Sequence, residues 1–120
     1  MAGFHHRTLP DDSALLAGHT PPDELGFRSE QLQIWYNNTE EAWRDHALHW
    51  HEESDECFIV LRGSLVVEVE AGERHVIGAG EFCCFPRGML HGVVEVHPPV
   101  ETFMIRAPSV ADKQYSAEDA

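Results

Sequence analysis

The pattern of apolar and polar residues changes near residue 32. Before that point the chain contains several prolines and glycines and one short helix-compatible stretch, Asp11 to Ala17, which two acidic residues open. After it, short apolar or alternating runs follow one another, each ended by Gly, Pro or Asn, which is typical of β-strands joined by turns. The pattern predicts an all-β domain preceded by an irregular N-terminal arm, residues 1–31.

Eight runs are predicted to be strands: Leu32–Asn37, Arg44–His51, Cys57–Leu61, Ser64–Glu70, Glu73–Ile77, Glu81–Phe85, Gly92–His97 and Glu101–Arg106. Tight hairpin turns are expected at Arg62-Gly63 and Ala71-Gly72, because glycine readily adopts a positive φ. Eight short strands without intervening helices favour a small antiparallel β-barrel or jelly roll over residues 32–106, since such folds limit exposed sheet edges. The polar residues 107–120 are expected to form a fraying tail.

Length and charge narrow the possible functions. With 120 residues the chain has room for one domain. Eight Lys and Arg against 21 Asp and Glu give a formal net charge of -13, and such a surface repels nucleic-acid phosphates and anionic lipids. No apolar segment resembles a signal peptide or a membrane span, so a cytoplasmic location is expected. We therefore expect a small-molecule ligand, and neither nucleic acid nor membrane, as the partner.

Four side chains are candidates for a metal site. His49 and His51 lie two apart in one predicted strand, so both imidazoles point to the same face. After a turn, Glu56 begins the next strand and brings its carboxylate back toward this pair. His91 opens a further strand, and in a closed sheet it can converge with the other three. Three imidazoles and one carboxylate suit Fe, Mn, Ni, Cu, Co or Zn better than Ca or Mg, which favour oxygen ligands.

The spacing of these residues resembles the two motifs of the cupin superfamily. The first motif, His-x-His followed by Glu and Gly, is reproduced by His49, His51, Glu56 and Gly63. The second, Gly followed by Pro-x-Gly and His, is matched by Gly80, Pro86, Gly88 and His91. The resemblance implies a jelly roll that holds one divalent transition metal per chain.

Two positions depart from the cupin pattern. Trp43 stands where a glycine usually precedes the first motif, and Glu95 stands where an asparagine often follows the last histidine. By strand parity with His91, Glu95 should point inward and place a second carboxylate near the metal. It is therefore a candidate catalytic base or a residue that orients a ligand imidazole, with a salt bridge inside the barrel as the alternative.

Three apolar side chains share the strand parity of the ligands and should line the barrel interior: Phe58, Val60 and Val93. They are candidates for an apolar substrate pocket, with core packing as the alternative. The cysteines are odd in number and two are adjacent, which suits neither a disulfide framework nor a zinc ribbon. Cys57 is expected to be an inert thiol. One of Cys83 and Cys84 should face the interior, and whether that cysteine forms a crosslink or acts as an extra metal ligand is left open.

The resemblance implies a metal-dependent enzyme, such as a dioxygenase, an isomerase, a decarboxylase or a cyclase. An apolar wall and few nearby basic residues favour oxygen chemistry on an uncharged enol or aromatic substrate, with Arg62, Arg87 and Arg106 in solvent at turns and strand ends. The alternative is a non-catalytic module that binds or senses a small ligand at the metal. A homodimer is also expected, because the apolar run Leu32 to Tyr36 would be open to sheet extension as an edge strand.

Overall fold

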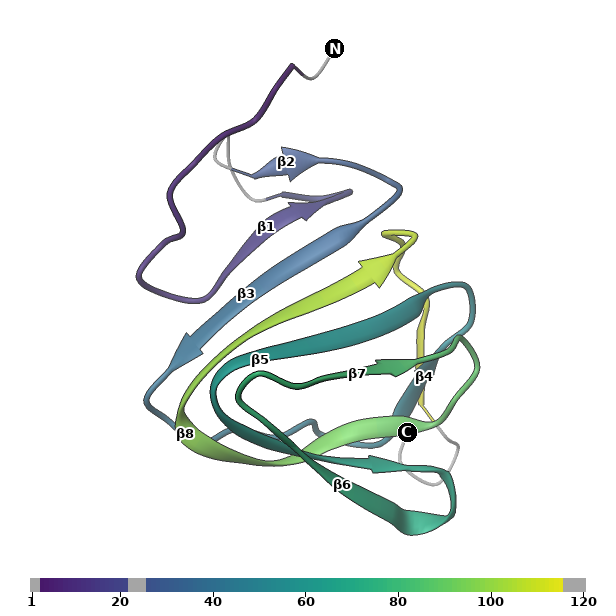
Figure 1. Cartoon of the computed structure of the whole chain (residues 1–120). Coiled ribbons are helices and arrows are strands. Elements are labelled where there is room, and N and C mark those ends of the chain that lie inside the picture. The colour runs from purple at the N-terminus through teal and green to yellow at the C-terminus, as the bar shows by residue number, and fades with distance from the viewer. Residues whose placement is uncertain (1–2, 22–25, 116–120) are drawn as a thin grey trace.

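The computed structural model describes residues 3–21 and 26–115, which form nine strands and one 3-10 turn (Figure 1). The strands are β1 (Ala14–Gly18), β2 (Phe27–Arg28), β3 (Gln33–Thr39), β4 (His49–His51), β5 (Asp55–Val69), β6 (Glu73–Gly78), β7 (Phe82–Phe85), β8 (His91–Ala107) and β9 (Lys113–Tyr115), with the turn at Glu70–Gly72. The predicted all-β class is confirmed. In this part of the chain no helix is long and apolar enough to cross a lipid bilayer.

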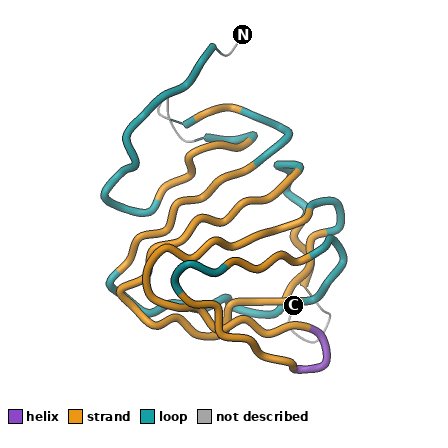
Figure 2. Tube along the Cα trace, in the orientation of Figure 1, coloured by secondary structure: helices purple, strands orange, loops and turns teal. Residues whose placement is uncertain are grey.

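Two long strands organise the sheet, because β5 and β8 curve over and each contributes to two layers (Figures 1 and 2). The first half of β5 pairs with the second half of β8, from Asp55↔Ala107 to Val60↔Thr102, and the remaining halves pair from Ser64↔His97 to Val69↔His91. One layer therefore runs β2-β1-β3-β8-β5-β7 and the other β9-β4-β8-β5-β6. The result is a jelly roll whose sheet does not close.

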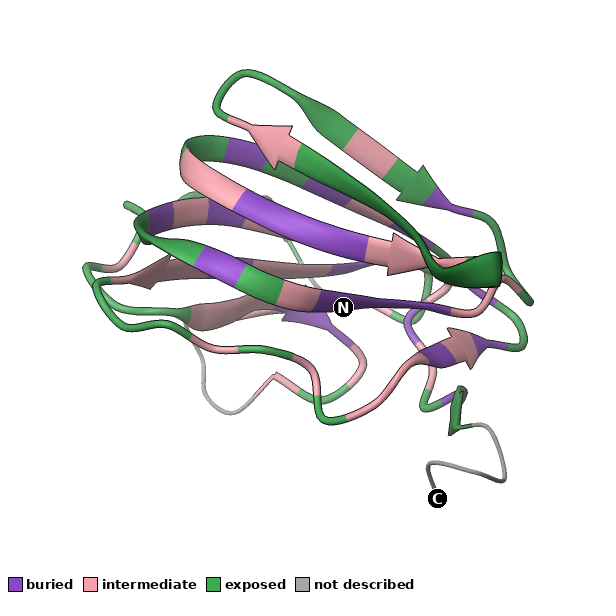
Figure 3. Cartoon of the chain, turned by 90° about the horizontal axis from the view of Figure 1, so that it is seen from below, coloured by how far each residue is buried: buried purple, intermediate pink, exposed green. Residues whose placement is uncertain are grey.

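The core lies between the two layers, and Figure 3 shows buried positions along the strands, interspersed with exposed ones, and further exposed positions at the turns. Its buried side chains come from both halves of the long strands and from β7: Phe58, Val60, Leu65, Val67, Phe85, Val93, Val96 and Val100. These residues alternate with outward-facing ones, as a sheet with one covered face requires.

The expected hairpin at Arg62-Gly63 is wrong, because β5 continues through these residues. Gly63 has a φ of +75°, and a Cβ there would lie 2.4 Å from the carbonyl oxygen of Pro99 on β8. The glycine thus allows the two curved strands to cross closely. The turn at Ala71-Gly72 is confirmed as the link between β5 and β6, with positive φ at both residues.

Both ends of the chain are more ordered than the sequence indicates. The helix-compatible stretch ending at Ala17 is instead largely β1, which pairs with β3, since a neighbouring strand overrides weak local preference. In the expected fraying tail, Ser109 and Asp112 are buried and Lys113–Tyr115 pairs with β4, so this expectation is wrong up to residue 115. Residues 116–120 of that expectation lie outside the described residues.

The apolar run at Leu32 to Tyr36 does not form a sheet edge. It falls in β3, which is paired with β1 on one side and with β8 on the other. The structural reason given for a homodimer is therefore wrong, and the dimer stays a prediction that light scattering can test.

Candidate metal centre

The structure brings the four motif side chains together. His49 and His51 come from β4, Glu56 from the start of β5 and His91 from the start of β8, directly opposite His49. One ligand atom from each lies within 4.8 Å of the others, and all four residues are buried. Convergence of three imidazoles and a carboxylate in the interior makes a group that could hold a metal ion.

The outer nitrogen of each imidazole faces an oxygen that can only accept a hydrogen bond. Nδ1 lies 3.3 Å from the Ala47 carbonyl for His49, 3.1 Å from Asp112 Oδ1 for His51 and 2.8 Å from the Met89 carbonyl for His91. In a neutral ring, a proton on Nδ1 satisfies this oxygen and leaves Nε2 with a free lone pair, although for His51 the Nη1 donor of Arg106 also lies 3.2 Å from Nδ1. This tautomer is the one that a metal at Nε2 requires.

Two of the inner nitrogens face the carboxylate of Glu56. Nε2 of His51 is buried without a hydrogen bond, although Oε2 of Glu56 lies 3.4 Å away. Nε2 of His91 lies 2.8 Å from Oε1 of Glu56. With the ring proton on Nδ1, these two atoms face each other as acceptors, so the arrangement needs a cation or a second proton between them. The donor set thus fits a divalent transition metal.

The protonation states also suit metal binding. Burial alone would raise the pKa of Glu56, but His51 and His91, which donate hydrogen bonds to its carboxylate whenever Nε2 carries a proton, hold that pKa well below its usual range. Burial, with the neighbouring Lys113 and His91, lowers the pKa of His49 to about 4. At neutral pH these residues are a carboxylate and a neutral imidazole, the forms in which both can act as ligands.

A buried ring of the core fixes the orientation of His91. The phenyl ring of Phe85 stacks on the imidazole with centroids 4.0 Å apart and an interplanar angle of 8°. Phe85 is in turn held opposite Glu56 by the pairing of β7 with β5. Two of the four candidate ligands are therefore positioned by the same stretch of sheet.

Asp112 is part of this centre, and sequence reasoning missed it. Its Oδ2 accepts hydrogen bonds from the backbone nitrogens of Glu53 and Ser54, both at 2.9 Å, and from Oγ of Ser54 at 2.7 Å. Burial would raise its pKa, yet these hydrogen bonds and the contact with His51 hold that pKa below its usual value. No motif contains Asp112, and no signal in the sequence connects it to a histidine 61 residues away.

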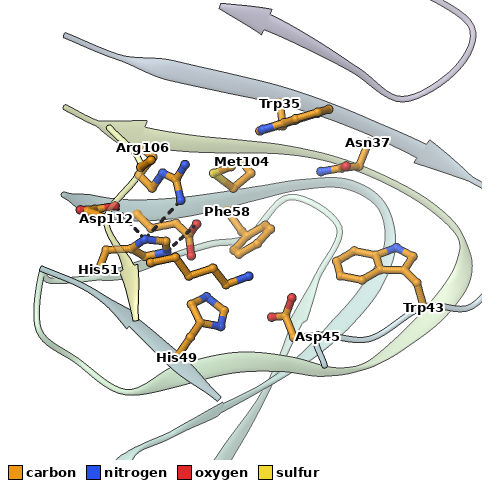
Figure 4. A pocket seen from close by; sticks show the side chains of 13 residues that line it. Trp35, Asn37, Trp43, Asp45, His49, His51, Phe58, Met104, Arg106 and Asp112 are labelled. Atoms are coloured by element: carbon orange, nitrogen blue, oxygen red, sulfur yellow. Dashed lines mark hydrogen bonds and ion pairs between the residues drawn. The ribbon is translucent and has the colours of Figure 1, made fainter. Parts of the chain in front are cut away.

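A cavity of about 470 Å³ opens beside the cluster (Figure 4). Cross-strand rows build its wall, because Trp35 of β3, Met104 of β8 and Phe58 of β5 lie in register. Besides these and three of the candidate ligands, it is lined by Asn37, Trp43, Asp45, Arg106, Ala111, Asp112 and Lys113. The predicted pocket residue Phe58 lies here, whereas Val60 and Val93 are fully buried in the core and do not line it.

Glu95 does not point into the barrel, so the parity argument for it is wrong. Val67 pairs with Val93 and Val66 with Glu95, which leaves Val94 as an extra residue in a β-bulge. The bulge reverses the alternation of faces, and Glu95 becomes exposed, with Oε2 3.5 Å from Nε2 of His97. It lies away from the metal cluster and has no place in the candidate site.

Arg106 is not in solvent at a strand end, as the sequence suggests. It is half-buried and lines the cavity, because β8 continues to Ala107 and places Arg106 directly opposite Glu56. Cationic groups at the site are therefore underestimated by sequence reasoning.

None of the three cysteines belongs to the ligand cluster. Cys57 and Cys84 face each other on the outer side of β5 and β7, with Sγ atoms 2.7 Å apart. Burial and the neighbouring Cys84 raise the pKa of Cys57 to about 12, which agrees with an inert thiol. Cys83 packs against the core.

The fold and the cluster define a jelly-roll domain with a candidate metal centre between its layers, and the comparisons specify the family. The chain belongs to the cupin family, because a family model described as "Cupin domain" matches residues 39–105. The uncharacterized protein YdbB of Bacillus subtilis (strain 168) is 40% identical over 43 residues, which are 36% of this chain and 38% of that protein. The chain thus matches well under half the length of this curated relative.

Two solved structures show how widely the fold is shared. A cupin protein from Bacteroides fragilis superimposes with a TM-score of 0.66 at 13% identity, over 100% of this chain and 97% of that one. The DMSP lyase DddQ from Ruegeria pomeroyi DSS-3 superimposes with a TM-score of 0.62 at 18% identity, over 87% of this chain and 50% of that one. At these identities the likeness shows the fold alone, and the chain spans half of the lyase.

Proposed function

We propose that this cupin is an enzyme that holds one divalent transition metal per chain and acts on a small molecule in the adjoining cavity. The observation that carries the proposal is the convergence of three imidazoles and one carboxylate, all buried, beside an open cavity. Three imidazoles and a carboxylate suit Fe, Mn, Ni, Cu, Co or Zn. When bound, such an ion supplies Lewis-acid polarisation and, where it is redox-active, reactivity toward dioxygen.

The chain itself orients the imidazoles and gives the cavity an aromatic wall. Asp112 and the carbonyls of Ala47 and Met89 orient the imidazoles. Trp35, Trp43 and Phe58 offer flat apolar surface for the body of a ligand, next to the polar cluster. We propose an enol or aromatic compound as the substrate, and dioxygenase-like oxygen chemistry as the reaction.

Two other functions compete with oxygen chemistry. The first is a reaction without dioxygen, of the lyase, isomerase or cyclase kind; one structure that shares the fold is a DMSP lyase. The second is a module that binds a small ligand at the metal without turnover. The residues that line the cavity are compatible with oxygen chemistry, with a reaction that needs no dioxygen and with ligand binding without turnover.

One experiment separates them. Protein freed of metal with a chelator is reloaded with Fe, Mn, Ni, Cu, Co or Zn in turn, and dioxygen uptake and product formation are followed with catechol and 2,4-pentanedione. We expect uptake with at least one redox-active metal and none in chelated protein. Product formed without dioxygen uptake would replace oxygenation by lyase or isomerase chemistry. Unaltered compounds with every metal would overturn the oxygenase proposal in favour of a binding module.

A further inference from the structure

The cavity contains two cations that no carboxylate of the described residues neutralises. Arg106 and Lys113 both line it, and within the described ranges no Asp or Glu oxygen lies within 4 Å of either. The chain has only eight Lys and Arg against 21 Asp and Glu, so unpaired cations are not expected from composition. Their unneutralised charge is available to a ligand.

The pairing of strands holds Arg106 in place. It lies between Gln33 of β3 and Glu56 of β5 in one cross-strand row, and Nη2 donates a hydrogen bond to Oε1 of Gln33. Nη1 is 3.2 Å from Nδ1 of His51, which can accept a hydrogen bond from it only when the ring proton sits on Nε2 rather than facing Asp112. Nε is buried without a partner. The guanidinium is thus anchored at one end and keeps unmatched donors beside the cavity.

The carboxylates of the same cavity are already engaged by donors. Asp45 accepts a hydrogen bond of 2.7 Å from the backbone nitrogen of Val93. Asp112 accepts three hydrogen bonds from the turn that precedes β5, and Glu56 belongs to the ligand cluster. The other cation, Lys113, has its Nζ 5.4 Å from the ring centroid of Tyr115, and its charge also acts on His49. The side chains of the cavity that remain available to a ligand are therefore cations and aromatic rings.

We propose that the substrate is a small carboxylic acid whose carboxylate binds Arg106 with help from Lys113, while its flat apolar body lies against Trp35 and Phe58. This inference deepens the proposed function and rests on it, because the reactive part of the acid would be acted on at the proposed metal centre. Recognition of the acid depends on the two cations. An arginine suits a carboxylate because its planar donors match two oxygens. A monoanion is favoured over a phosphate dianion, since three carboxylates surround the cavity and repel a second charge more strongly.

Matched pairs of acids and neutral amides test this directly: benzoate with benzamide, phenylacetate with phenylacetamide, and salicylate with salicylamide. Binding is measured by calorimetry in zinc-loaded protein whose metal content is known from elemental analysis, and phenyl phosphate is included. We expect at least one acid to bind about 10- to 100-fold more tightly than its amide, as for hydrogen bonds to charged groups. Arg106→Gln should remove this preference without lowering metal content, and Lys113→Gln should reduce it. Arg74→Gln, at an exposed ion pair with Glu68, should leave it intact.

Several results would overturn the inference. They are equal binding of acids and amides, no binding of any acid at millimolar concentration, retained preference in Arg106→Gln, and tighter binding of phenyl phosphate than of every acid. If the protein binds no metal yet prefers acids through Arg106, the enzyme proposal fails and this inference stands. If metal is bound and acids are not preferred, this inference fails and the enzyme proposal stands.

Discussion

Asp112 and His51 lie side by side in the interior, with Oδ1 of the carboxylate 3.1 Å from Nδ1 of the imidazole, although 61 residues separate them in the chain. The other oxygen of Asp112 holds the backbone of Glu53 and Ser54, between His51 and Glu56. One carboxylate therefore contacts one candidate ligand and holds the turn that leads to the next. A carboxylate behind a ligand imidazole is a common way to orient it and raise its basicity.

Asp112→Asn is expected to lower metal affinity about 10- to 100-fold, because the amide cannot provide the charge that orients and polarises His51. Competition against a chromogenic chelator measures the affinity. Asp12→Asn, at an exposed position, is the control and should bind metal as the wild type does. Unchanged affinity in Asp112→Asn would show that the contact with His51 does not act on the metal.

The metal-free protein is expected to lose stability as the pH falls from about 6.5 to about 4, because the pKa of His49 is lowered from 6.5 to about 4 by burial and by nearby positive charge. In this window the unfolded chain takes up a proton at His49 that the folded chain does not, so acid favours unfolding. One such proton changes the free energy of unfolding by at most about 1.4 kcal/mol per pH unit.

Urea unfolding of chelator-treated protein at several pH values measures this dependence. His49→Gln should flatten it, whereas His75→Gln, at an exposed position, should not. An identical slope in wild type and His49→Gln would contradict the assignment.

Glu95→Gln is expected to leave metal content and stability unchanged, since the side chain is 61% exposed on the outer side of β8. Glu56→Gln provides the contrast, because it removes the carboxylate of the ligand cluster and should lower metal occupancy. Elemental analysis and thermal unfolding check both variants. Loss of metal in Glu95→Gln would restore the inward orientation that strand parity suggests.

Gly63→Ala is expected to destabilise the fold by about 2–4 kcal/mol, because it combines a positive φ with a Cβ 2.4 Å from the carbonyl oxygen of Pro99. Gly72→Ala also falls at a positive φ, but its Cβ would meet nothing within 4 Å, so only about 1–2 kcal/mol is expected there. Urea unfolding gives the difference between the two. Equal losses would show that the crossing of β5 and β8 relaxes to accept a methyl group.

The sequence predicts the ligand cluster because its features are local. His49 and His51 share a face by simple alternation, and the motif spacing adds Glu56 and His91. Alternation fails at Glu95, since a single bulge residue, Val94, reverses the faces and leaves no mark in a run of valines. The all-β class follows from the pattern of turns in the same way.

The sequence does not predict the residues that pairing across the sheet brings into the site. Arg106 belongs to the site because β8 pairs with β5 beside Glu56, and Asp112 because the C-terminal segment that follows it pairs with β4. Neither placement is encoded by spacing along the chain. Gly63 likewise looks like a hairpin residue until its close approach to Pro99 is known.

The central claim is that four side chains hold one divalent transition metal, and the metal content of ligand variants tests it most directly. Protein purified without chelators, reloaded and desalted, is assayed by elemental analysis as wild type, His49→Ala, His51→Ala, Glu56→Gln and His91→Ala, with His97→Ala as an exposed control. We predict close to one metal per chain in the wild type and the control, and a clear loss in each ligand variant. Full metal content in all four variants, or no metal in reloaded wild type, would contradict it.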